Sequence, residues 1–288
     1  TNNGSTYIGS GSGGILLTSA PAFPVLDDTQ YNDLLFEAES HQGTYNNYAL
    51  DFDGNNDFIK INNSNDINTG SHHTNKTIEA WFKVDNKNVS SHKQTIYEQG
   101  GTVRGLNIYI FGGALYVGGW NEPESRWNPG TWLSTNSIQS NTWHHVALTL
   151  SGGNSVSNNA FKGYLDGIQF GSGKGSKLWH HPGDVSIGRN RDTKFHSGDF
   201  GSARYFSGLI DEVRLWNTTR TEAQIYSKKD SVLSGDELGL TAYYNFQENS
   251  GIVANDGQTQ SNNDGSINNG AIWTSGPPLS KMNNSSFE

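Results

Sequence analysis

The sequence has no cysteine among its 288 residues. This absence excludes disulfide bonds, a thiol nucleophile, a zinc–thiolate site and an iron–sulfur cluster. Charged residues are also few, at 16%, and acidic ones outnumber basic ones by 28 to 19, so the formal net charge is −9. No run of lysine or arginine compensates for this charge. The composition therefore argues against a nucleic-acid partner, whose phosphate backbone attracts basic patches.

Long apolar runs are missing as well. No stretch approaches the roughly 18 apolar residues that a membrane-spanning helix requires, so we expect no membrane insertion. The sequence also shows no signal peptide, which a mature secreted protein would have lost. Aromatic residues nevertheless make up 11% of the chain, unlike the aromatic-poor and charge-rich composition of a disordered protein. We therefore expect a folded chain with a buried core.

Both ends of the sequence have the composition of linkers. Residues 1–14 are mostly glycine, serine, asparagine and threonine, and residues 275–288 are rich in proline, serine and asparagine, as in flexible linkers. We predict a linker and entry segment over residues 1–34, one folded domain over residues 35–275 and a C-terminal linker over residues 276–288. A domain between two linkers suggests a piece of a longer multidomain polypeptide.

Between these ends, apolar and polar residues alternate as they do in half-buried strands. The alternation predicts strands over residues 49–52, 57–61, 77–84, 105–111, 114–118, 143–150, 162–165, 184–188, 208–216 and 240–246, and one more near 271–273. Only residues 220–233 have helical spacing, and Thr221 is a suitable N-cap. We predict an all-β fold, an antiparallel two-sheet β-sandwich with one short helix.

Residues 118–132 contain Trp120, Trp127 and Trp132. Their many proline, glycine and asparagine neighbours predict a loop. Because a folded chain normally buries tryptophan, a tryptophan in a polar loop is either a packed lid or a platform for a ligand. Sugar rings have apolar C–H faces edged by hydroxyl groups and suit such a platform. Trp179 and His180, in a second predicted loop, are further candidates.

Other aromatic side chains fall in predicted strands. Trp81, Trp143 and Trp216 are expected in the core. His144 and His145 follow Trp143 directly. Since neighbours on a strand point to opposite faces, these histidines cannot bind one metal ion together, and we expect one of them to be packed and the other exposed.

A second segment, residues 188–206, gathers basic side chains in an otherwise acidic chain: Arg189, Arg191, Lys194, His196 and Arg204. Guanidinium groups bind carboxylates and sulfates through paired hydrogen bonds, so an anionic polysaccharide is a reasonable ligand class. The alternative is a solvated loop in which the arginines pair with Asp192 and Asp199.

Several motifs follow one another in a recognisable order. They are Leu50-Asp-Phe-Asp-Gly-Asn-Asn-Asp-Phe-Ile-Lys-Ile61, Thr77-Ile-Glu-Ala-Trp-Phe82, Trp143-His-His-Val-Ala-Leu148, Tyr164-Leu-Asp-Gly167, Ser186-Ile-Gly188 and Gly208-Leu-Ile-Asp-Glu-Val-Arg-Leu-Trp-Asn217. Together they resemble the laminin-G-like jelly roll of the concanavalin A-like lectin/glucanase superfamily, in the form found in secreted Bacteroidetes-type proteins. The resemblance covers residues 36–273. It implies a jelly roll in a secreted or cell-surface bacterial protein, on a fold that hosts lectins, carbohydrate-binding modules, adhesion domains, glucanases and lyases.

The first motif also contains a candidate metal site. Asp51, Asp53, Asn55 and Asp57 place oxygen atoms at alternate positions, which suits a hard cation. The resemblance implies a structural Ca²⁺ bound by Asp53, Asp57 and Asp211 with backbone carbonyl groups. The alternative is that these carboxylates cap the turn through hydrogen bonds to nearby N–H groups.

Signatures of catalysis are weak. No alternating acidic motif is present that would hold two carboxylates about 5–5.5 Å apart, as retaining glucanases require, and there is no Gly-x-Ser-x-Gly elbow. A polysaccharide lyase needs a tyrosine or histidine base and a cation near the uronate. Tyr205, His196, Arg189 and Arg204 are the residues that could supply these roles.

The sequence therefore favours a non-catalytic, lectin-like carbohydrate-binding module that recognises an extracellular polysaccharide by aromatic stacking and Arg/His contacts. The candidate binding residues are Trp120, Trp127, Trp132, Trp179, His180, Arg189, Arg191, His196 and Arg204. Two alternatives stay open: a polysaccharide lyase or glycoside hydrolase domain on the same fold, and a protein-binding adhesion domain.

Overall fold

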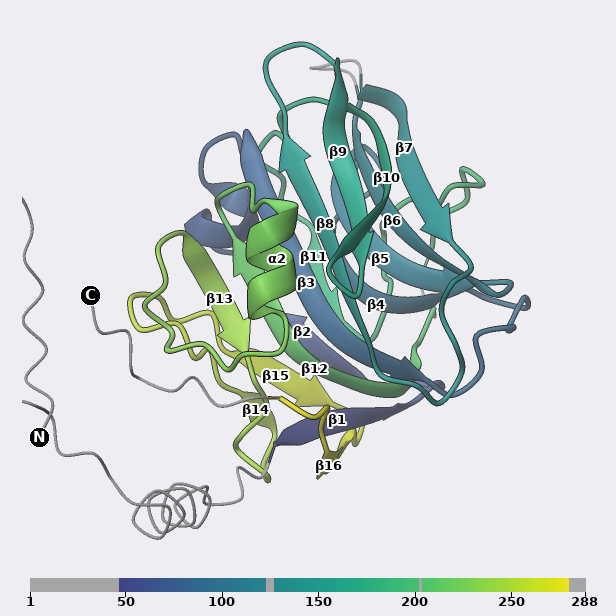
Figure 1. Cartoon of the computed structure of the whole chain (residues 1–288), viewed down its shortest axis with the longest axis vertical. Helices are drawn as coiled ribbons and strands as arrows, with labels where there is room; N and C mark the ends of the chain where they lie inside the picture. The colour runs from purple at the N-terminus through teal and green to yellow at the C-terminus, as the bar shows by residue number, and fades with distance from the viewer. Residues whose placement is uncertain (1–46, 123–126, 202–203, 280–288) are drawn as a thin grey trace, which may run out of the picture. The chain divides into compact units, whose positions relative to one another are not determined.

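The structure is a computed structural model that describes residues 47–279, except residues 123–126 and 202–203. The linker predicted over residues 1–34 lies outside the described residues, as do residues 280–288 of the second predicted linker. In the described part, the strands form two antiparallel sheets of eight strands each (Figure 1). The predicted two-sheet sandwich is confirmed.

Sheet A has the strand order β10-β9-β8-β3-β12-β1-β16, with β13 paired to β12. Its strands are β1 (Tyr48–Asp53), β3 (Asn75–Val84), β8 (His144–Ser151), β9 (Ser157–Leu165), β10 (Ile168–Gly175), β12 (Ser207–Trp216), β13 (Leu240–Tyr244) and β16 (Ile272–Ser275). Strands far apart in the sequence are neighbours here, as in a jelly roll.

Sheet B has the strand order β14-β15-β2-β11-β4-β5-β6-β7. Its strands are β2 (Phe58–Ile61), β4 (Gln94–Gly100), β5 (Arg104–Phe111), β6 (Ala114–Asn121), β7 (Trp127–Thr135), β11 (Asp184–Ile187), β14 (Val253–Ala254) and β15 (Gly265–Asn268). A π-helical turn, η1 (Asn65–Thr69), follows β2, and one α-helix, α2 (Glu222–Lys228), follows β12. Alternate apolar residues of both sheets fill one common core, among them Phe52, Phe82, Ile108, Val117 and Leu148.

The prediction of a loop over residues 118–132 is wrong, because both ends of this segment are strands. Gly118 in β6 is paired with Trp132 in β7, and Gly119 with Thr131. A Cβ atom on Gly118 would lie 2.4 Å from the Trp132 Nε1, and one on Gly119 would lie 2.5 Å from the Trp127 ring. These glycines make room for indole rings inside a sheet, so they do not mark turns.

The predicted helix is confirmed in a shorter form, Glu222–Lys228. Thr221 is its N-cap: its side chain accepts a hydrogen bond from the Gln224 N–H, and the Gln224 side chain accepts one from the Thr221 N–H, which is a capping box. Ile225 packs with Ala147 and Tyr164 of sheet A. The helix thus covers part of the outer face of this sheet (Figure 1).

A buried group of charges lies on the same face. Glu79 in β3 is fully buried and forms ion pairs with Arg220 (Nη1–Oε1 3.0 Å) and with Arg214 (Nη1–Oε2 4.0 Å), and the His145 Nε2 lies 3.3 Å from its Oε2. Burial alone raises the pKa of Glu79, but the hydrogen bond with His145 and the charge of Arg220 outweigh it and hold that pKa below its usual value. The carboxylate is therefore ionised and paired.

Arg214 in β12 connects this group to the end of α2. Its Nη2 lies 2.5 Å from the Glu212 Oε2 and donates to the Ser231 carbonyl oxygen at 2.6 Å, while its Nη1 donates to the Lys228 carbonyl oxygen at 2.9 Å. The side chain is fully buried. One guanidinium group thus pairs with a carboxylate of β12 and donates hydrogen bonds to two carbonyl groups at and just beyond the end of α2.

The expectations for the aromatic neighbours of this face are corrected in two places. His144 and His145 are both buried, at 7% and 0% exposure, because His144 faces the core and pairs with Asp166 while Trp81 and Glu79 cover His145. Trp143, expected in the core, is half-buried with the Lys83 Nζ 5.7 Å from its ring. Trp81 and Trp216 are buried, as predicted.

Replacing Arg214 tests how strongly the buried charges determine stability. Arg214→Leu leaves the buried Glu212 carboxylate without its cation and takes away one of the two arginines that face Glu79, which should lower the free energy of unfolding by about 3–5 kcal/mol. The control is Arg191→Leu, since Arg191 pairs with Asp192 at the surface and should contribute less than about 1 kcal/mol. Urea unfolding midpoints measure both changes. Equal midpoints for the two variants would contradict this interpretation.

Candidate functional site

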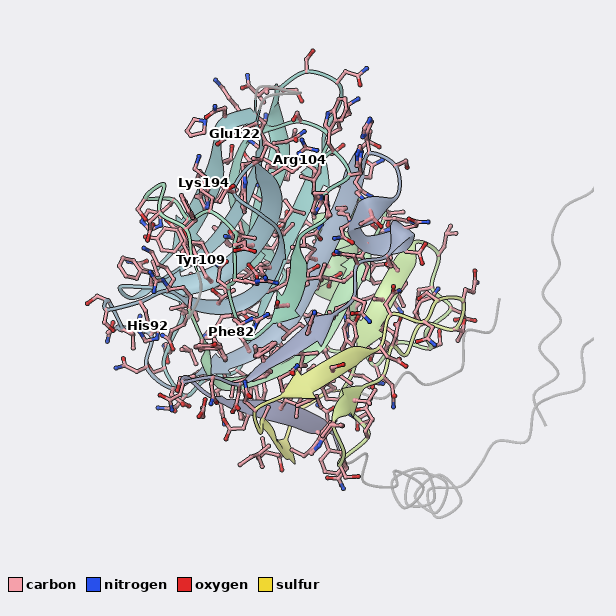
Figure 2. All side chains as sticks on the ribbon, turned by 180° about the vertical axis from the view of Figure 1, so that it is seen from behind. Phe82, His92, Arg104, Tyr109, Glu122 and Lys194 are labelled. Carbon is pink, nitrogen blue, oxygen red and sulfur yellow. The ribbon has the colours of Figure 1, made fainter. Side chains whose placement is uncertain are left out.

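Residues 191–196 of the basic segment lie against the outer face of sheet B, where Figure 2 labels Lys194. The Glu98 Oε1 accepts a hydrogen bond from the Arg191 N–H (2.7 Å), and the Asn107 Nδ2 donates to the Lys194 carbonyl oxygen (2.8 Å). The Tyr109 hydroxyl accepts one from the His196 N–H (3.2 Å). The backbone of this segment is therefore bound to outward-facing side chains of β4 and β5.

Phe195 anchors the same segment through apolar contact. It is fully buried, and its ring meets Tyr109 edge-on, with centroids 4.8 Å apart at 77°. The Lys93 Nζ lies 5.3 Å from the Phe195 ring and 2.5 Å from the Asp199 Oδ2. Asp199 is thus paired with Lys93, the residue just before β4, where the sequence suggested an arginine of its own segment.

Three rings lie nearly parallel beside this anchor. Tyr116 of β6 stacks on His196 (centroids 4.5 Å apart, 6°) and on Tyr109 (5.0 Å, 3°). Burial raises the pKa of Tyr109 well above its usual value, and burial together with Lys93 lowers the pKa of His196. The Tyr109 hydroxyl lies 2.7 Å from the His196 Nδ1, within hydrogen-bond distance. Tyr109 is buried, whereas Tyr116 is half-buried and His196 exposed.

Trp132 continues this aromatic surface on β7. It is half-buried and lies directly over Gly118, nearly parallel to the Trp120 ring beneath it (5.9 Å, 17°). Because Gly118 has no side chain, the indole ring can lie low against the sheet and keep one side toward solvent. We call Tyr116, Trp132 and His196 the ring strip.

Polar groups border the ring strip. The Trp132 Nε1 and the Asn107 Oδ1 both lie close to Gly118, and neither has a hydrogen-bond partner among the described residues. On the side of the basic segment, the Lys194 Nζ forms an ion pair with the Glu122 Oε1 at 2.5 Å. Figure 2 shows Glu122, Lys194 and Tyr109 on this one face. The face thus combines aromatic surface with a fixed pair of charges, whereas the Trp132 Nε1 and the Asn107 Oδ1 are buried.

A second aromatic cluster lies near the start of β5. Trp179 is half-buried and packs against His72 (centroids 4.0 Å apart, 41°), and His72 stacks on the exposed His180 (5.7 Å, 17°). The Arg104 Nη1 donates to the His180 carbonyl oxygen at 2.9 Å, and the Lys177 Nζ lies 4.9 Å from the Trp179 ring. The predicted pair Trp179 and His180 therefore stays a candidate, with two cations beside it.

Two of the predicted platform residues are instead part of the interior. Trp120 is fully buried and its Nε1 donates to the Gly101 carbonyl oxygen. Trp127 is 2% exposed, packs edge-on against Phe161 in the core and donates to the Thr131 hydroxyl. The expectation of solvent-facing rings at these positions is wrong, because β6 and β7 are strands whose side chains are packed on this part of the sheet.

The predicted arginines do not gather around the ring strip. The Arg189 guanidinium lies 3.5 Å from the Phe58 ring on β2, whereas His196 stacks on Tyr116 of β6. Three strands separate β2 from β6, a distance of roughly 19 Å at the usual strand spacing. Arg191 is exposed beside Asp192 (3.6 Å).

The residues proposed for a lyase are therefore not assembled. Arg204 and Tyr205 are both half-buried, and the Arg204 carbonyl oxygen accepts a hydrogen bond from the Asn190 N–H. Arg189, which would neutralise a uronate, lies over β2. His196, which would act as base, lies over β6. The described geometry offers no common point for the four groups.

The carboxylates suggested for calcium lie in two places. The Asp53 Oδ1 accepts from the N–H groups of Asn55 and Asn56, and the Asp57 Oδ2 accepts from the Asp53 N–H. Asp53 is paired with Ser207, so Asp211 is four residues further along β12. Among the described residues no three acidic or histidine side chains are grouped to hold a metal ion. The three predicted ligands therefore do not fit a single site.

Calcium binding itself stays a prediction for the turn that contains Asp53 and Asp57. Melting the protein with and without EDTA tests it. A lower melting temperature in EDTA supports a bound ion, and an identical one supports the hydrogen-bonded turn alone.

The sequence matches the family model described as the concanavalin A-like lectin/glucanases superfamily over residues 27–226. The chain belongs to this superfamily. No curated protein matches the sequence. Among the described residues, no helix has the length and apolar character that a membrane span requires.

Two solved structures share this fold. One is a protein of Bacteroides ovatus ATCC 8483 named as a candidate carbohydrate binding protein, with 24% identity and a TM-score of 0.57 over 81% of this chain and 61% of that one. The other is the native heptameric SAP-like pentraxin of Limulus polyphemus, with 17% identity and a TM-score of 0.52 over 82% and 98%. This chain thus spans about three fifths of the Bacteroides protein.

Several residues of the candidate site escaped the sequence analysis, above all Tyr109, Tyr116 and Asn107. All three occupy alternate positions of predicted strands, facing away from the core residues Ile108 and Val117. An aromatic residue at an outward position of a strand is a signal that could have found the tyrosines. The sequence does not show which strands are neighbours, so it could not bring His196 to them.

Lowering the pH should destabilise the domain through His181, next to the Trp179 cluster. Its Nδ1 lies 2.7 Å from the Trp179 carbonyl oxygen and its Nε2 lies 3.1 Å from the Gln99 Nε2, so both nitrogens are used by the neutral ring. Burial lowers its pKa to about 4. Between pH of about 6.5 and 4 the unfolded chain binds a proton that the folded chain does not, which should remove roughly 3 kcal/mol of stability.

Urea unfolding from pH 4 to 7 measures this dependence. His181→Gln should weaken the pH dependence over this range and leave the part due to His73, whose burial lowers its pKa to about 3. His180→Gln, at the exposed neighbour, should leave the dependence as in the natural protein. The explanation fails if the His181→Gln variant keeps the full dependence.

Proposed function

We propose that this domain binds an extracellular polysaccharide on the ring strip without cleaving it. The observation that carries the proposal is the set of partly exposed, low-lying rings on one open sheet face: Trp132 over Gly118, and Tyr116 stacked on His196 at 4.5 Å. Exposed aromatic rings held rigid by packing present a large contact area at little entropic cost.

The chemistry of this face suits a sugar. An indole and a phenol ring offer flat apolar surface to the C–H face of a pyranose. Beside the rings, the Lys194 ammonium group is paired with the Glu122 carboxylate, with which an acidic group of a ligand would compete. A sugar unit with an acidic substituent can therefore place its ring on Trp132 and its charge toward Lys194.

The arrangement supports binding in preference to catalysis. The Tyr109 hydroxyl is buried and already bonded to His196 on both sides, so it is not positioned to abstract a proton from a substrate. The buried carboxylates of Glu79 and Glu212 are paired with arginines beneath α2. The fold shared with the Bacteroides ovatus protein named for carbohydrate binding supports the same function and an extracellular location.

Removing the Trp132 ring should weaken binding. Trp132→Ala should lower affinity for a bound polysaccharide about tenfold or more, because aromatic contacts of this size contribute on the order of 1–2 kcal/mol. Trp132→Phe should restore part of the loss. The matched control is Tyr226→Ala, which removes an exposed ring on α2 and should leave affinity unchanged.

Affinity electrophoresis against xylan, arabinan, polygalacturonate, alginate and carrageenan finds the ligand, and isothermal titration then gives the affinities. Failure to bind any of these polymers would overturn the proposal, as would equal affinity of the alanine variant. Ultraviolet absorbance from an unsaturated uronate during incubation would show a lyase, and binding to a protein that sugar does not displace would show an adhesion domain.

A further inference from the structure

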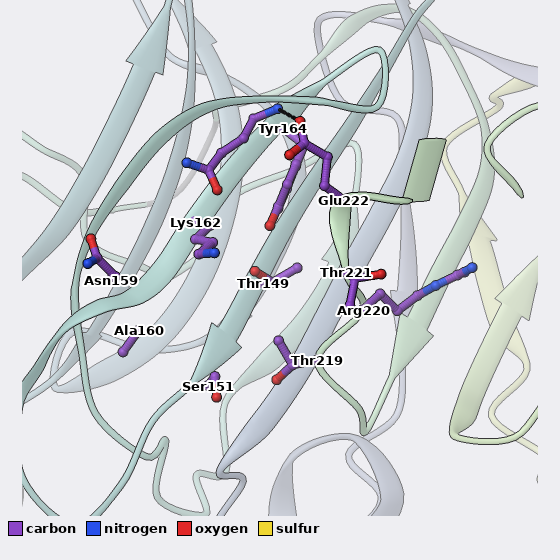
Figure 3. A pocket seen from close by; sticks show the side chains of 11 residues that line it. Thr149, Ser151, Asn159, Ala160, Lys162, Tyr164, Thr219, Arg220, Thr221 and Glu222 are labelled. Atoms are coloured by element: carbon purple, nitrogen blue, oxygen red, sulfur yellow. Dashed lines mark hydrogen bonds between the residues drawn. The ribbon is translucent and has the colours of Figure 1, made fainter. Parts of the chain in front are cut away.

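A separate cavity of about 360 Å³ lies on the outer face of sheet A, the sheet that does not carry the ring strip (Figure 3). Its lining residues are Thr149, Ser151, Asn159, Ala160, Lys162, Tyr164, Gln169, Thr219, Arg220, Thr221 and Glu222. The size lies within the usual range of small-ligand sites. None of these residues belongs to the ring strip or to the Trp179 cluster.

The cavity lies between the strands at one edge of sheet A and the chain that leads into α2. Its floor is made by outward positions of β8 and β9, where Thr149 is paired with Lys162. The chain entering α2 forms the opposite wall (Figure 3). The two sides are joined where the Glu222 Oε1 accepts a hydrogen bond from the Gln169 N–H at 2.9 Å. Ala160 and Ser151, both small, leave the floor low.

The lining is dominated by groups that recognise hydroxyls. Thr149, Ser151, Thr219 and Thr221 contribute hydroxyl groups from both walls, and Asn159 contributes an amide. The cavity also has apolar wall, to which Ala160 and Tyr164 contribute. It suits a compact polyhydroxylated ligand that can exchange many weak hydrogen bonds with water for equivalent bonds with the protein.

Lys162 supplies the free positive charge. It is half-buried in the floor, and no hydrogen bond or ion pair joins it to another described residue. Arg220, in contrast, points away from the cavity (Figure 3) and is held by Glu79 at 3.0 Å and by the Trp216 ring at 4.1 Å. Lys162 is therefore the cation that a ligand entering this cavity meets.

We infer that this cavity is a second saccharide site, which takes one sugar unit with its carboxylate or sulfate on Lys162 and its hydroxyls on Thr149, Ser151 and Asn159. The ring strip and the cavity lie on the outer faces of opposite sheets. A domain with both sites holds two polysaccharide chains, or two parts of one chain, on its two sides.

The experiment titrates the protein with trigalacturonate and, separately, with a sulfated galactose trisaccharide, and follows backbone amide NMR signals. Signals of β8 and β9 should shift with the anionic probes and much less with neutral galactotriose. Lys162→Ala should weaken this binding about tenfold or more, since charge-assisted hydrogen bonds are the strong ones. Lys174→Ala, which removes an exposed lysine of β10, should leave it unchanged. Which probe binds tells carboxylate from sulfate.

The outcomes separate this inference from the proposed function. Shifts confined to β6 and β7 would overturn the second site and leave the ring strip standing. Shifts at β8 and β9 that survive Trp132→Ala would support the second site even if the ring strip bound nothing. Equal shifts with neutral and anionic probes, or an unchanged affinity of Lys162→Ala, would overturn the inference as well.

With polymeric polygalacturonate or carrageenan, a two-sited domain should cross-link chains and raise turbidity. Either Lys162→Ala or Trp132→Ala should abolish the turbidity. Turbidity that persists in Lys162→Ala would contradict the second site.

Discussion

The arrangement of sheet A depends on the burial of Glu79 between two arginines. An ionised carboxylate in the interior is costly unless it is paired with opposite charge, and Arg220 and Arg214 supply that charge from the turn before α2 and from β12. Arg214 also donates to the carbonyl groups of Lys228 and Ser231, at and just beyond the end of the helix, and Arg220 donates to the Gln224 carbonyl group within it. The helix is only seven residues long, too short to be stable alone, and these bonds fix where it lies.

The outer faces of the two sheets are covered by different elements. Sheet A is covered by a short helix held on buried charges, and the open space beside it is the hydroxyl-lined cavity. Sheet B is covered by an irregular segment bonded through its backbone to Glu98, Asn107 and Tyr109. In each case the cover leaves part of the sheet open, and the side chains next to the cover are held rigid. Rigid groups beside an opening are what a binding surface needs.

The sequence was informative where local pattern and global fold agree. Period-two alternation and the ordered motifs predicted the sandwich, and Thr221 marked the start of the helix. The same reasoning failed for Trp120 and Trp127, because glycine near tryptophan occurs in two structural contexts. In a turn it permits unusual backbone angles, and inside a sheet it makes space for a neighbouring ring, as Gly118 and Gly119 do. Only the strand pairing, a long-range property, distinguishes the two. The same long-range pairing decides that Arg189 and His196, seven residues apart in sequence, lie on different parts of the sheet.

Because Gly118 has no side chain, it allows the Trp132 indole ring to lie close to the sheet. A methyl group there would collide with the Trp132 Nε1 and with the Asn107 Oδ1, so even alanine would lift the ring toward solvent. The clearance between this ring and the adjacent basic segment would then change without any alteration of the core. A single backbone position thus sets how far this indole ring stands out from the sheet.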